Sequence, residues 1–493
     1  MKRSKHALSS THLTSFDMGQ LVPVNLLETL PGDSIQCSTS ALIRCAPMLA
    51  PPMHPVRVRI HHWFVPHRLV WANFENFITG GPDGNDASVF PTKSSFAVAA
   101  GTLANYLGLP VATVPAVSAL PFRAYALIWN EYYRDQDLQT ALTVNTGDGV
   151  DATTPVTLQN CDWEKDYFTS SRPWEQKGPA VSIPIGTSAP VIRNPSSGAI
   201  NSSLIRVSST GATTTAQDTL QHATDGKLRS PTHTTGLTLD PNGSLIADLS
   251  SVSGITVNAL RQSLALQRFE EARARYGSRY AEYLRALGVR SSDARLQRPE
   301  YLGGGVSTIQ FSEVMQTAQD STNPVGTLRG HGITAMRSNR FRRFFEEHGY
   351  IITLASILPK TIYMDGVERS WNRRTKYDFW QKELENLGQQ SILNKEIYAA
   401  SGTPDGVFGY QDRYDEYRRQ WSRVSGEFAT SVLDYWHFAR KFASAPALNS
   451  TFVSAVPPSR AFASSINDVI YAQFRHSIQA RRLVSKTAFP QTF

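Results

Sequence analysis

Runs of alternating or continuous apolar residues predict several β-strands in this chain. At the start of residues 56–65, apolar Val or Ile at positions 56, 58 and 60 alternates with basic Arg or His at positions 57, 59 and 61. This two-residue period is typical of a half-buried strand. Pro66 ends this run, because proline donates no backbone hydrogen bond. Residues 349–358 form a continuous apolar run typical of a buried strand, and residues 20–30 and 34–44 predict two more strands, divided by a turn at Pro31-Gly32-Asp33.

Helical periodicity is confined to a few segments. Residues 67–78 suit a short helix that stops at Gly80 and Gly81. Residues 258–288 carry two apolar stripes on either side of a break at Gly277, and a third candidate helix lies near 411–421. The stripes consist of Ala265, Phe269, Ala272 and Tyr276, and of Tyr280, Leu284 and Leu287. Separated strands with helices grouped between them predict a mainly β body with helical insertions, not regular β–α–β alternation.

A change in side-chain type marks one boundary. Between Trp174 and Phe269 there is no Phe, Trp or Tyr, although about nine would be expected in 94 residues at the chain's 10% aromatic content. Ser, Thr, Gly and Asn dominate this stretch, but spaced aliphatic residues remain, as at Leu237 and Leu239. We interpret residues 186–256 as a surface insertion of short strands and turns; a disordered linker is the alternative.

Basic charge is concentrated at the two ends of the 493-residue chain. The formal net charge is +8, and residues 1–16 and 471–493 supply +7 of it without a single acid. Their basic residues are Lys2, Arg3, Lys5, Arg475, Arg481, Arg482 and Lys486. A basic N-terminal arm (1–16) and a basic C-terminal tail (471–493) on a nearly neutral body (17–185 and 257–470) suggest phosphate contacts, with solubilising termini as the alternative.

The remaining composition narrows the class of protein. Charged residues make up only 18% of the chain, which suits a protein that hides surface in contacts with partners as well as an ordinary folded domain. Three cysteines without a C-x-x-C spacing make a disulfide framework or a cysteine zinc site improbable and fit a reducing compartment. The N-terminus has no apolar segment of the kind that secretory signals contain.

The sequence offers little catalytic chemistry. It contains no P-loop, no G-x-S-x-G and no H-E-x-x-H, and Gly303-Gly304-Gly305 is expected to mark a tight turn. His61 and His62 would point to opposite faces of one strand, so structural roles are favoured over metal binding for the histidines at 54–67. Asp135 and Asp137 form a D-x-D that could hold a divalent cation, but turn capping is the favoured interpretation.

Arginine is enriched at 261–298, with nine Arg against four acids. Arginine there could bind phosphate or the carboxylates of a neighbouring subunit. Because aromatic residues interleave with these arginines, we favour a subunit interface.

A series of longer motifs recurs in a fixed order along almost the whole chain. These are FDMG (16–19), LPGD (30–33), STSALIR (38–44), MHPVRVRIHHWFVPHRLVW (53–71), FITGG (77–81), LPFRAYALIWNEYYRDQDL (120–138), DYFTSSRPWEQKG (166–178), YGSRYAEYLRALGV (276–289), RLQRPEYLGGG (295–305), GTLRGHGI (326–333), EHGYII (347–352) and VFGYQDRYDEYRR (407–419). In these motifs the sequence resembles the major capsid proteins of microviruses, of the gokushovirus type. The likeness fades at 186–256.

The resemblance implies a viral jelly roll of eight antiparallel strands in two sheets, with long inter-strand insertions containing helices. It implies a structural protein without a cofactor that forms pentamers and a sixty-copy T=1 icosahedral shell around a circular single-stranded DNA genome, in virions assembled in the host bacterial cytoplasm. Implied partners are a small basic DNA-packing protein, a DNA pilot protein, an internal scaffolding protein and a host cell-surface receptor. The insertion would form protrusions near the threefold axes, used in host attachment.

Two other functions compete with this interpretation. A non-viral jelly-roll protein that binds glycans would need exposed aromatic platforms, and the insertion has none. A nucleic-acid enzyme would need clustered acids or a nucleophile with its base, and no convincing set is found. Particle size separates both from a capsid protein, since either would be a small oligomer.

Overall fold

The computed structural model describes residues 3–179, 181, 257–276, 297–319 and 324–486, together with six short strands between 191 and 247. The chain divides into two compact units. The first contains residues 1–177 and 273–493, and the second contains residues 178–272.

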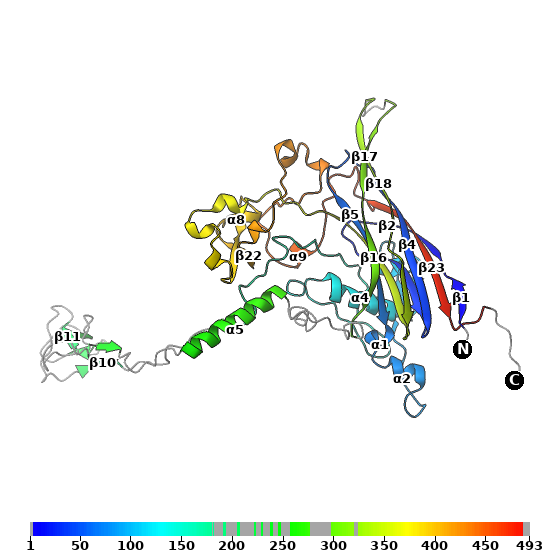
Figure 1. Ribbon diagram of the computed structural model, residues 1–493, viewed down its shortest axis with the longest axis horizontal. Helices are drawn as coiled ribbons and strands as arrows, with labels where there is room; N and C mark the ends of the chain where they lie inside the picture. Colours follow the sequence, from blue (N-terminus) through cyan, green and yellow to red (C-terminus); the bar gives the residue numbers. More distant parts are fainter. Residues whose placement is uncertain are drawn as a thin grey trace. The chain divides into compact units, whose positions relative to one another are not determined.

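Antiparallel sheets make the first unit mainly β (Figure 1). Within the described residues, one sheet has seven strands. Its central strands are β4 (Asp33–Cys45) and β23 (Ile470–Arg482), paired to each other along most of their length. β1 (Ser4–Ala7) and β2 (Ser10–Phe16) pair with the free side of β23, while β18 (Leu328–Arg337) and β19 (Phe341–Phe345) pair with the free side of β4. β17 (Gln310–Met315) follows β18 at the edge.

A second sheet of four described strands packs against the first. Its order is β16 (Glu300–Thr308), β5 (Val56–Pro66), β20 (Gly349–Pro359) and β3 (Val22–Thr29). Apolar side chains from both sheets meet in one buried cluster, including Val58 and Ile357 from the second sheet and Ile43 and Phe474 from the first. The main core therefore lies between two antiparallel sheets.

Helices and loops cover the other face of the four-stranded sheet. Trp63 and Ile352 pack there against Val70 of α1 (His67–Val70), Leu103 of α3 (Leu103–Tyr106) and Phe122 of α4 (Leu120–Ile128). β5 and β20 are therefore buried on both sides, which explains the continuous apolar run at 349–358. Among the described residues, no helix is both long and apolar enough to pass through a membrane.

The other elements that the structure describes in the first unit are short. Three strand pairs are β6 (Thr92–Lys93) with β9 (Val117–Ser118), β7 (Phe96–Ala97) with β8 (Thr113–Val114), and β21 (Gln389–Leu393) with β22 (Val407–Asp412). The short helices are α2 (Phe74–Thr79), α8 (Asn394–Ile397), α9 (Ser450–Val453) and the π-helix η1 (Trp129–Tyr133). The 3₁₀ helices are η2 (Arg369–Asn372), η3 (Lys376–Asp378), η4 (Lys382–Leu384), η5 (Asp415–Tyr417), η6 (Gly426–Ala429) and η7 (Asp434–Trp436).

The sequence predicted the central strands correctly and several other elements incorrectly. The strands expected at 56–65 and 349–358 are β5 and β20, and the turn before Asp33 separates β3 from β4. The helix expected at 67–78 is two short helices, and the one expected near 411–421 is the end of β22 followed by η5. The glycines at 303–305 are not a tight turn but lie within β16, where a Cβ on Gly304 would stand 2.1 Å from the Ile60 carbonyl oxygen. Glycine is needed there because two strands approach closely.

His61 and His62 do occupy opposite faces of β5. The His62 Nε2 lies 3.1 Å from the Ser338 hydroxyl between the sheets, and the His61 Nδ1 lies 2.7 Å from the Tyr133 hydroxyl on the helical side. Burial lowers the pKa of His62 to about 3 and that of His61 to about 4. Both histidines are hydrogen-bonded parts of the packed body.

The second unit contains nested strand pairs. β10 (Val191–Arg193) pairs with β15 (Leu245–Ala247), β11 (Ile205–Val207) with β14 (Leu237–Leu239), and β12 (Gln221–His222) with β13 (Leu228–Arg229), all antiparallel. Short strands were expected here from the spaced aliphatic residues. The bounds 186–256 for the insertion remain a prediction. α5 (Val257–Tyr276) follows and leaves Phe269 of the first apolar stripe half exposed; the second stripe lies outside the described residues.

Candidate nucleic-acid interface

Among the described residues of the first unit, no other layer covers the outer face of the seven-stranded sheet (Figure 1). Along β23, buried residues alternate with exposed ones, so that Arg475, Gln479 and Arg481 point away from the core. On β4, the residues opposite these three are Ser40, Gln36 and Ser34. The core side of the sheet is apolar, and the outer side is polar.

The outer face is basic around β4 and β23. Strand register and the alternation of side chains place six cations on this outer face, all of them on β4, on β23 or at positions paired with these two strands. They are Lys5, Arg44, Arg337, Arg342, Arg475 and Arg481. No Asp or Glu occupies an outward position in these described strands. None of the six cations lies within ion-pair distance of a carboxylate in the described part of the chain, whereas the neighbouring Arg343 pairs with Glu300. The term outer sheet face refers below to these six residues and the strands that carry them.

Two of these cations stand directly across from each other. Lys5 on β1 is the register partner of Arg481 on β23. Like charges opposite each other on adjacent strands destabilise a sheet, so this pair costs stability unless an anion lies between them.

A shallow hollow of about 140 Å³ opens beside this pair. It is lined by Lys5, Ser34, Gln36, Arg342, Gln479, Ala480 and Arg481. Three cations, two amides and a hydroxyl supply hydrogen-bond donors without a competing carboxylate, which is the chemistry that binds a phosphate group.

The structure separates the seven candidate DNA-binding residues into groups. Lys5, Arg475 and Arg481 lie on the outer sheet face. Arg3 donates to the Gly32 carbonyl oxygen at 2.9 Å and lies over the Phe344 ring, and Lys486 is exposed at the end of the described residues. Lys2 lies outside the described residues.

Arg482 has a different environment from Arg481. Its Nε lies 2.9 Å from Oδ2 of Asp33, whose side chain is fully buried. Its charge is therefore neutralised within the protein. Arg44, Arg337 and Arg342 were not among the candidates, because strand register was needed to bring them to the same face.

Comparisons with known proteins match nearly the whole chain. The model of the capsid protein (F protein) family matches residues 1–492. The chain is 37% identical over 471 residues to capsid protein VP1 of Bdellovibrio phage phiMH2K, covering 92% of this chain and 88% of the relative. It is 36% identical over 537 aligned residues to capsid protein VP1 of Chlamydia phage 1, covering 93% and 90%. For capsid protein VP1 of Spiroplasma virus 4 the identity is 31% over 494 residues, covering 92% and 87%.

The chain belongs to the phage capsid protein (F protein) family. The resemblance to microvirus capsid proteins that the motifs indicated is confirmed.

The basic ends of this F protein family member are not free tails over most of their length. Residues 4–7 and 10–16 form β1 and β2, and residues 470–482 form β23 between them and β4. Their basic residues without any acid made these segments resemble terminal tails, but such residues also suit strands that have one covered and one exposed face. How far they act as a separate arm and tail remains a prediction.

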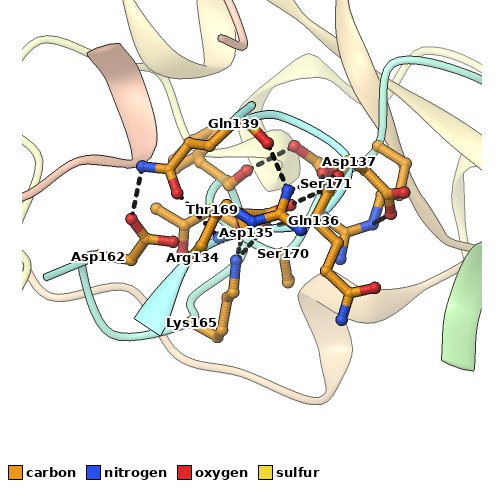
Figure 2. A network of polar contacts seen from close by, with 12 residues as sticks. Arg134, Asp135, Gln136, Asp137, Gln139, Asp162, Lys165, Thr169, Ser170 and Ser171 are labelled. Atoms are coloured by element: carbon orange, nitrogen blue, oxygen red, sulfur yellow. Dashed lines mark hydrogen bonds and ion pairs between the residues drawn. The ribbon is translucent and has the colours of Figure 1, made fainter. Parts of the chain in front are cut away.

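Both carboxylates of the D-x-D in this family member form ion pairs with lysine and arginine side chains (Figure 2). Asp135 pairs with Lys165 and Arg172, and Asp137 pairs with Arg172 and Lys177. Asp135 Oδ1 also accepts a hydrogen bond from the backbone N–H of Asp137 at 3.1 Å, a local turn contact. The Asp135 carboxylate therefore caps a local turn, as the favoured interpretation of the sequence had it, and ion pairs from both carboxylates tie this turn to residues 165–177.

Asp162, beside this network, should make stability depend on pH in the range from about 4 to about 7. Burial raises its pKa to about 7, although Lys165 and a 2.8 Å hydrogen bond from Gln139 favour the charged form. Because the folded-state pKa exceeds the unfolded value of 3.8, the stabilisation from the protonated carboxyl is complete below the unfolded pKa, falls as pH rises and is lost once pH passes about 7. We expect Asp162→Asn to gain about 1.4 kcal/mol over wild type per pH unit between these two pKa values, and nothing further at higher pH.

The measurement is denaturant unfolding of both proteins from about pH 4 to about pH 8.5, with a plateau in the difference expected above about pH 7. Gln139→Leu is a control, because it removes the hydrogen bond while leaving the carboxyl able to ionise. Parallel pH profiles for wild type and Asp162→Asn would contradict the assignment.

Proposed function

We propose that this chain is the major structural protein of a small phage capsid. Sixty copies form a T=1 icosahedral shell around a circular single-stranded DNA genome, in a virion assembled in the host bacterial cytoplasm. Family membership over residues 1–492 supports the structural role. The observation that carries the DNA-enclosing role is the outer sheet face, which is basic and free of acids at its outward positions.

The fold proposed for this role is the viral jelly roll. If β1 with β2 and β18 with β19 each count as one position, the seven-stranded sheet offers four positions besides the edge strand β17. The other sheet adds four. Two facing four-position antiparallel sheets joined by long connections support an eight-stranded jelly roll with helical insertions.

In the proposed particle, the outer sheet face lines the interior and contacts the phosphates of the genome. Other interior partners are a small basic DNA-packing protein and a DNA pilot protein, and an internal scaffolding protein takes part in assembly. Residues 186–256 form the protrusions near the threefold axes and contact the host receptor. The alternative, a non-viral jelly-roll protein that binds glycans, is not favoured by the family match.

Sedimentation of the protein from its native source, with nuclease treatment of the fractions, tests the proposal. We expect a fast particle that holds nuclease-resistant single-stranded DNA. A small oligomer from a native lysate, without protected DNA, would reject the capsid function and favour the glycan-binding alternative.

Neutralising the outer sheet face should weaken DNA binding in a salt-dependent way. In Arg475→Gln/Arg481→Gln, we expect the slope of log K against log salt for a single-stranded oligonucleotide to flatten by about 0.7 for each phosphate that the variant no longer neutralises. The measurement is a titration of dissociated subunits at several salt concentrations. Lys441→Gln removes an exposed cation that pairs with Asp434 and should leave the slope unchanged. An unchanged slope in the double variant would show that these arginines do not contact phosphate.

A further inference from the structure

One surface of the first unit combines exposed aromatic rings with cations. In residues 371–380, the side chains of Trp371, Tyr377, Phe379 and Trp380 are all at least about half exposed, and Trp371 reaches 70%. Water-exposed aromatic groups in such density are unusual on a protein that acts alone, and they are typical of protein interfaces.

Two cations of this surface, Arg374 and Lys376, lack carboxylate partners in the described part of the chain, whereas Arg373 lies 4.0 Å from Glu416. Arg374 donates to the carbonyl oxygens of Trp371 and Arg373, and the Lys376 Nζ lies 5.0 Å from the centre of the Tyr377 ring. The nearby Asp378 carboxylate accepts from the backbone N–H groups of Arg374 and Thr375. The set of Trp371, Arg374, Lys376, Tyr377, Phe379 and Trp380 is called the basic aromatic patch below.

A second surface of the same unit has the opposite charge. Residues 71–92 contain three acids, Glu75, Asp83 and Asp86, and no Lys or Arg, although the whole chain carries +8. This segment forms α2 and the glycine-rich turn after it, where Gly80, Gly81 and Gly84 adopt positive φ. It also exposes three apolar side chains, Phe77, Ile78 and Val89. The set of Glu75, Phe77, Ile78, Asp83, Asp86 and Val89 is called the acidic apolar tip below.

The tip and the patch cannot meet within one copy. Figure 1 shows α2 and its turn projecting from the helical end of the body, well away from the segment around α8 and β22 against which residues 369–384 fold. Their complementarity in charge and in apolar area can therefore be satisfied only between different copies.

We propose that the acidic apolar tip of one copy docks on the basic aromatic patch of a neighbouring copy, an inference that rests on the proposed capsid function. The contact joins two different surfaces, so it is heterologous, and repeating it by rotation closes a ring of subunits. The aromatic rings bury Phe77 and Ile78 of the neighbour, while Arg374 and Lys376 face Asp83 and Asp86. Opposite potentials steer the two surfaces together and fix their register.

Aromatic rings with cations also bind single-stranded DNA, and two observations favour a second copy instead. The acidic apolar tip supplies a matching surface in the same chain. The patch also lies on the side of the body away from β1, β23 and β4, which carry the outer sheet face proposed to contact the genome (Figure 1).

Paired charge reversal tests the contact. Asp83→Lys/Asp86→Lys on the tip and Arg374→Glu/Lys376→Glu on the patch should each lower the yield of particles about tenfold or more, because like charges then meet across the interface. All four substitutions together should restore assembly, since the charges are again opposite. Circular dichroism and the size of unassembled subunits check that each variant folds.

A mismatched combination controls for a general effect of charge. Asp405 is exposed, its carboxylate pairs with Lys395 on α8, and it belongs to neither of the two proposed surfaces. Asp405→Lys combined with Arg374→Glu/Lys376→Glu changes the net charge toward that of the wild type but should not restore assembly.

Three results would overturn the inference in distinguishable ways. Folded single-surface variants that the fourfold variant fails to rescue would exclude the contact while leaving the capsid function intact. Patch variants that assemble normally but retain no nuclease-resistant DNA would show that the patch binds the genome. A wild-type protein that forms no particles would reject the proposed function itself, and this inference with it.

Discussion

Replacing Arg123 with methionine is expected to lower the free energy of unfolding by about 3–5 kcal/mol, because the change leaves a buried carboxylate without its main partner. The side chains of Arg123 and Asp151 are both fully buried, and the Arg123 Nε lies 2.7 Å from Asp151 Oδ2. The other guanidinium nitrogens donate to the carbonyl oxygens of Val70 and Gly147, each at 3.0 Å. One side chain thus joins α4, α1 and the loop at 145–154.

The environment of Asp151 explains why the effect should be large. Its carboxylate also accepts hydrogen bonds from the backbone N–H groups of Thr153 and Thr154, from the Thr154 hydroxyl and from Lys93. Although burial raises the pKa of Asp151, these hydrogen bonds and the two cations outweigh it and hold the pKa well below its usual value. The stabilisation from this group is therefore present above the ordinary aspartate range and is lost as pH falls through the folded-state pKa.

Denaturant unfolding of wild type and Arg123→Met near neutral pH measures the effect. The difference should shrink at acid pH, where the orphaned carboxyl of the variant is protonated. Arg123→Met/Asp151→Asn should recover part of the stability, because no unpaired charge remains. Arg68→Met breaks a partly exposed pair with Glu347 and should cost about 1 kcal/mol or less. Equal destabilisation in the two arginine variants would contradict the argument.

The strands that form the core were predictable from sequence, because buried positions require apolar residues and these produce a regular pattern along the chain. β5 and β20 contribute apolar side chains to the clusters on both of their faces, and their sequences showed this as alternation or continuous hydrophobicity. The terminal strands were missed for a physical reason. β1 and β2 lie at a sheet edge with one open face, so short polar sequences suffice there, and their charges resembled those of a free arm.

The candidate interface could be predicted only in part. Lys5, Arg475 and Arg481 were found because charge clusters near the chain ends, but so was Arg482, which faces the buried Asp33. Which of two adjacent arginines faces outward depends on strand register, and register depends on pairings between residues more than 400 positions apart. Arg342 was missed for the same reason, since it reaches the interface through its pairing opposite Gln36.

The outer sheet face and the basic aromatic patch lie on opposite sides of the first unit, and we propose a different role for each. The outer sheet face has cations, amides and hydroxyls but few rings, which suits a sequence-independent contact with phosphates. The basic aromatic patch concentrates rings that stabilise a contact when water is excluded. Salt should therefore weaken genome retention more than it weakens contacts between subunits.

Removing the insertion is expected to abolish host attachment while particle yield stays at the wild-type level. The strand pairing explains why the body should tolerate this change. β10 and β15 are the outermost pair of the nested strands, with Val191 opposite Ala247, so the Cα atoms of these two residues lie about 5 Å apart. A short Gly/Ser linker can replace everything between them without stretching the chain. Residues 178–272 also form a compact unit of their own.

The comparison requires particles of the wild type and of the variant, purified by sedimentation and tested for adsorption to host cells. Equal amounts of nuclease-resistant DNA in both show that the shell and its genome are intact. A second variant, in which only residues 208–220 between β11 and β12 are replaced, tests whether attachment depends on a smaller part of the insertion. Failure of the first variant to form particles would mean that the insertion contributes to subunit contacts, and the protrusion assignment would then be wrong. Particles that assemble and still adsorb normally would place the receptor-binding surface elsewhere on the body.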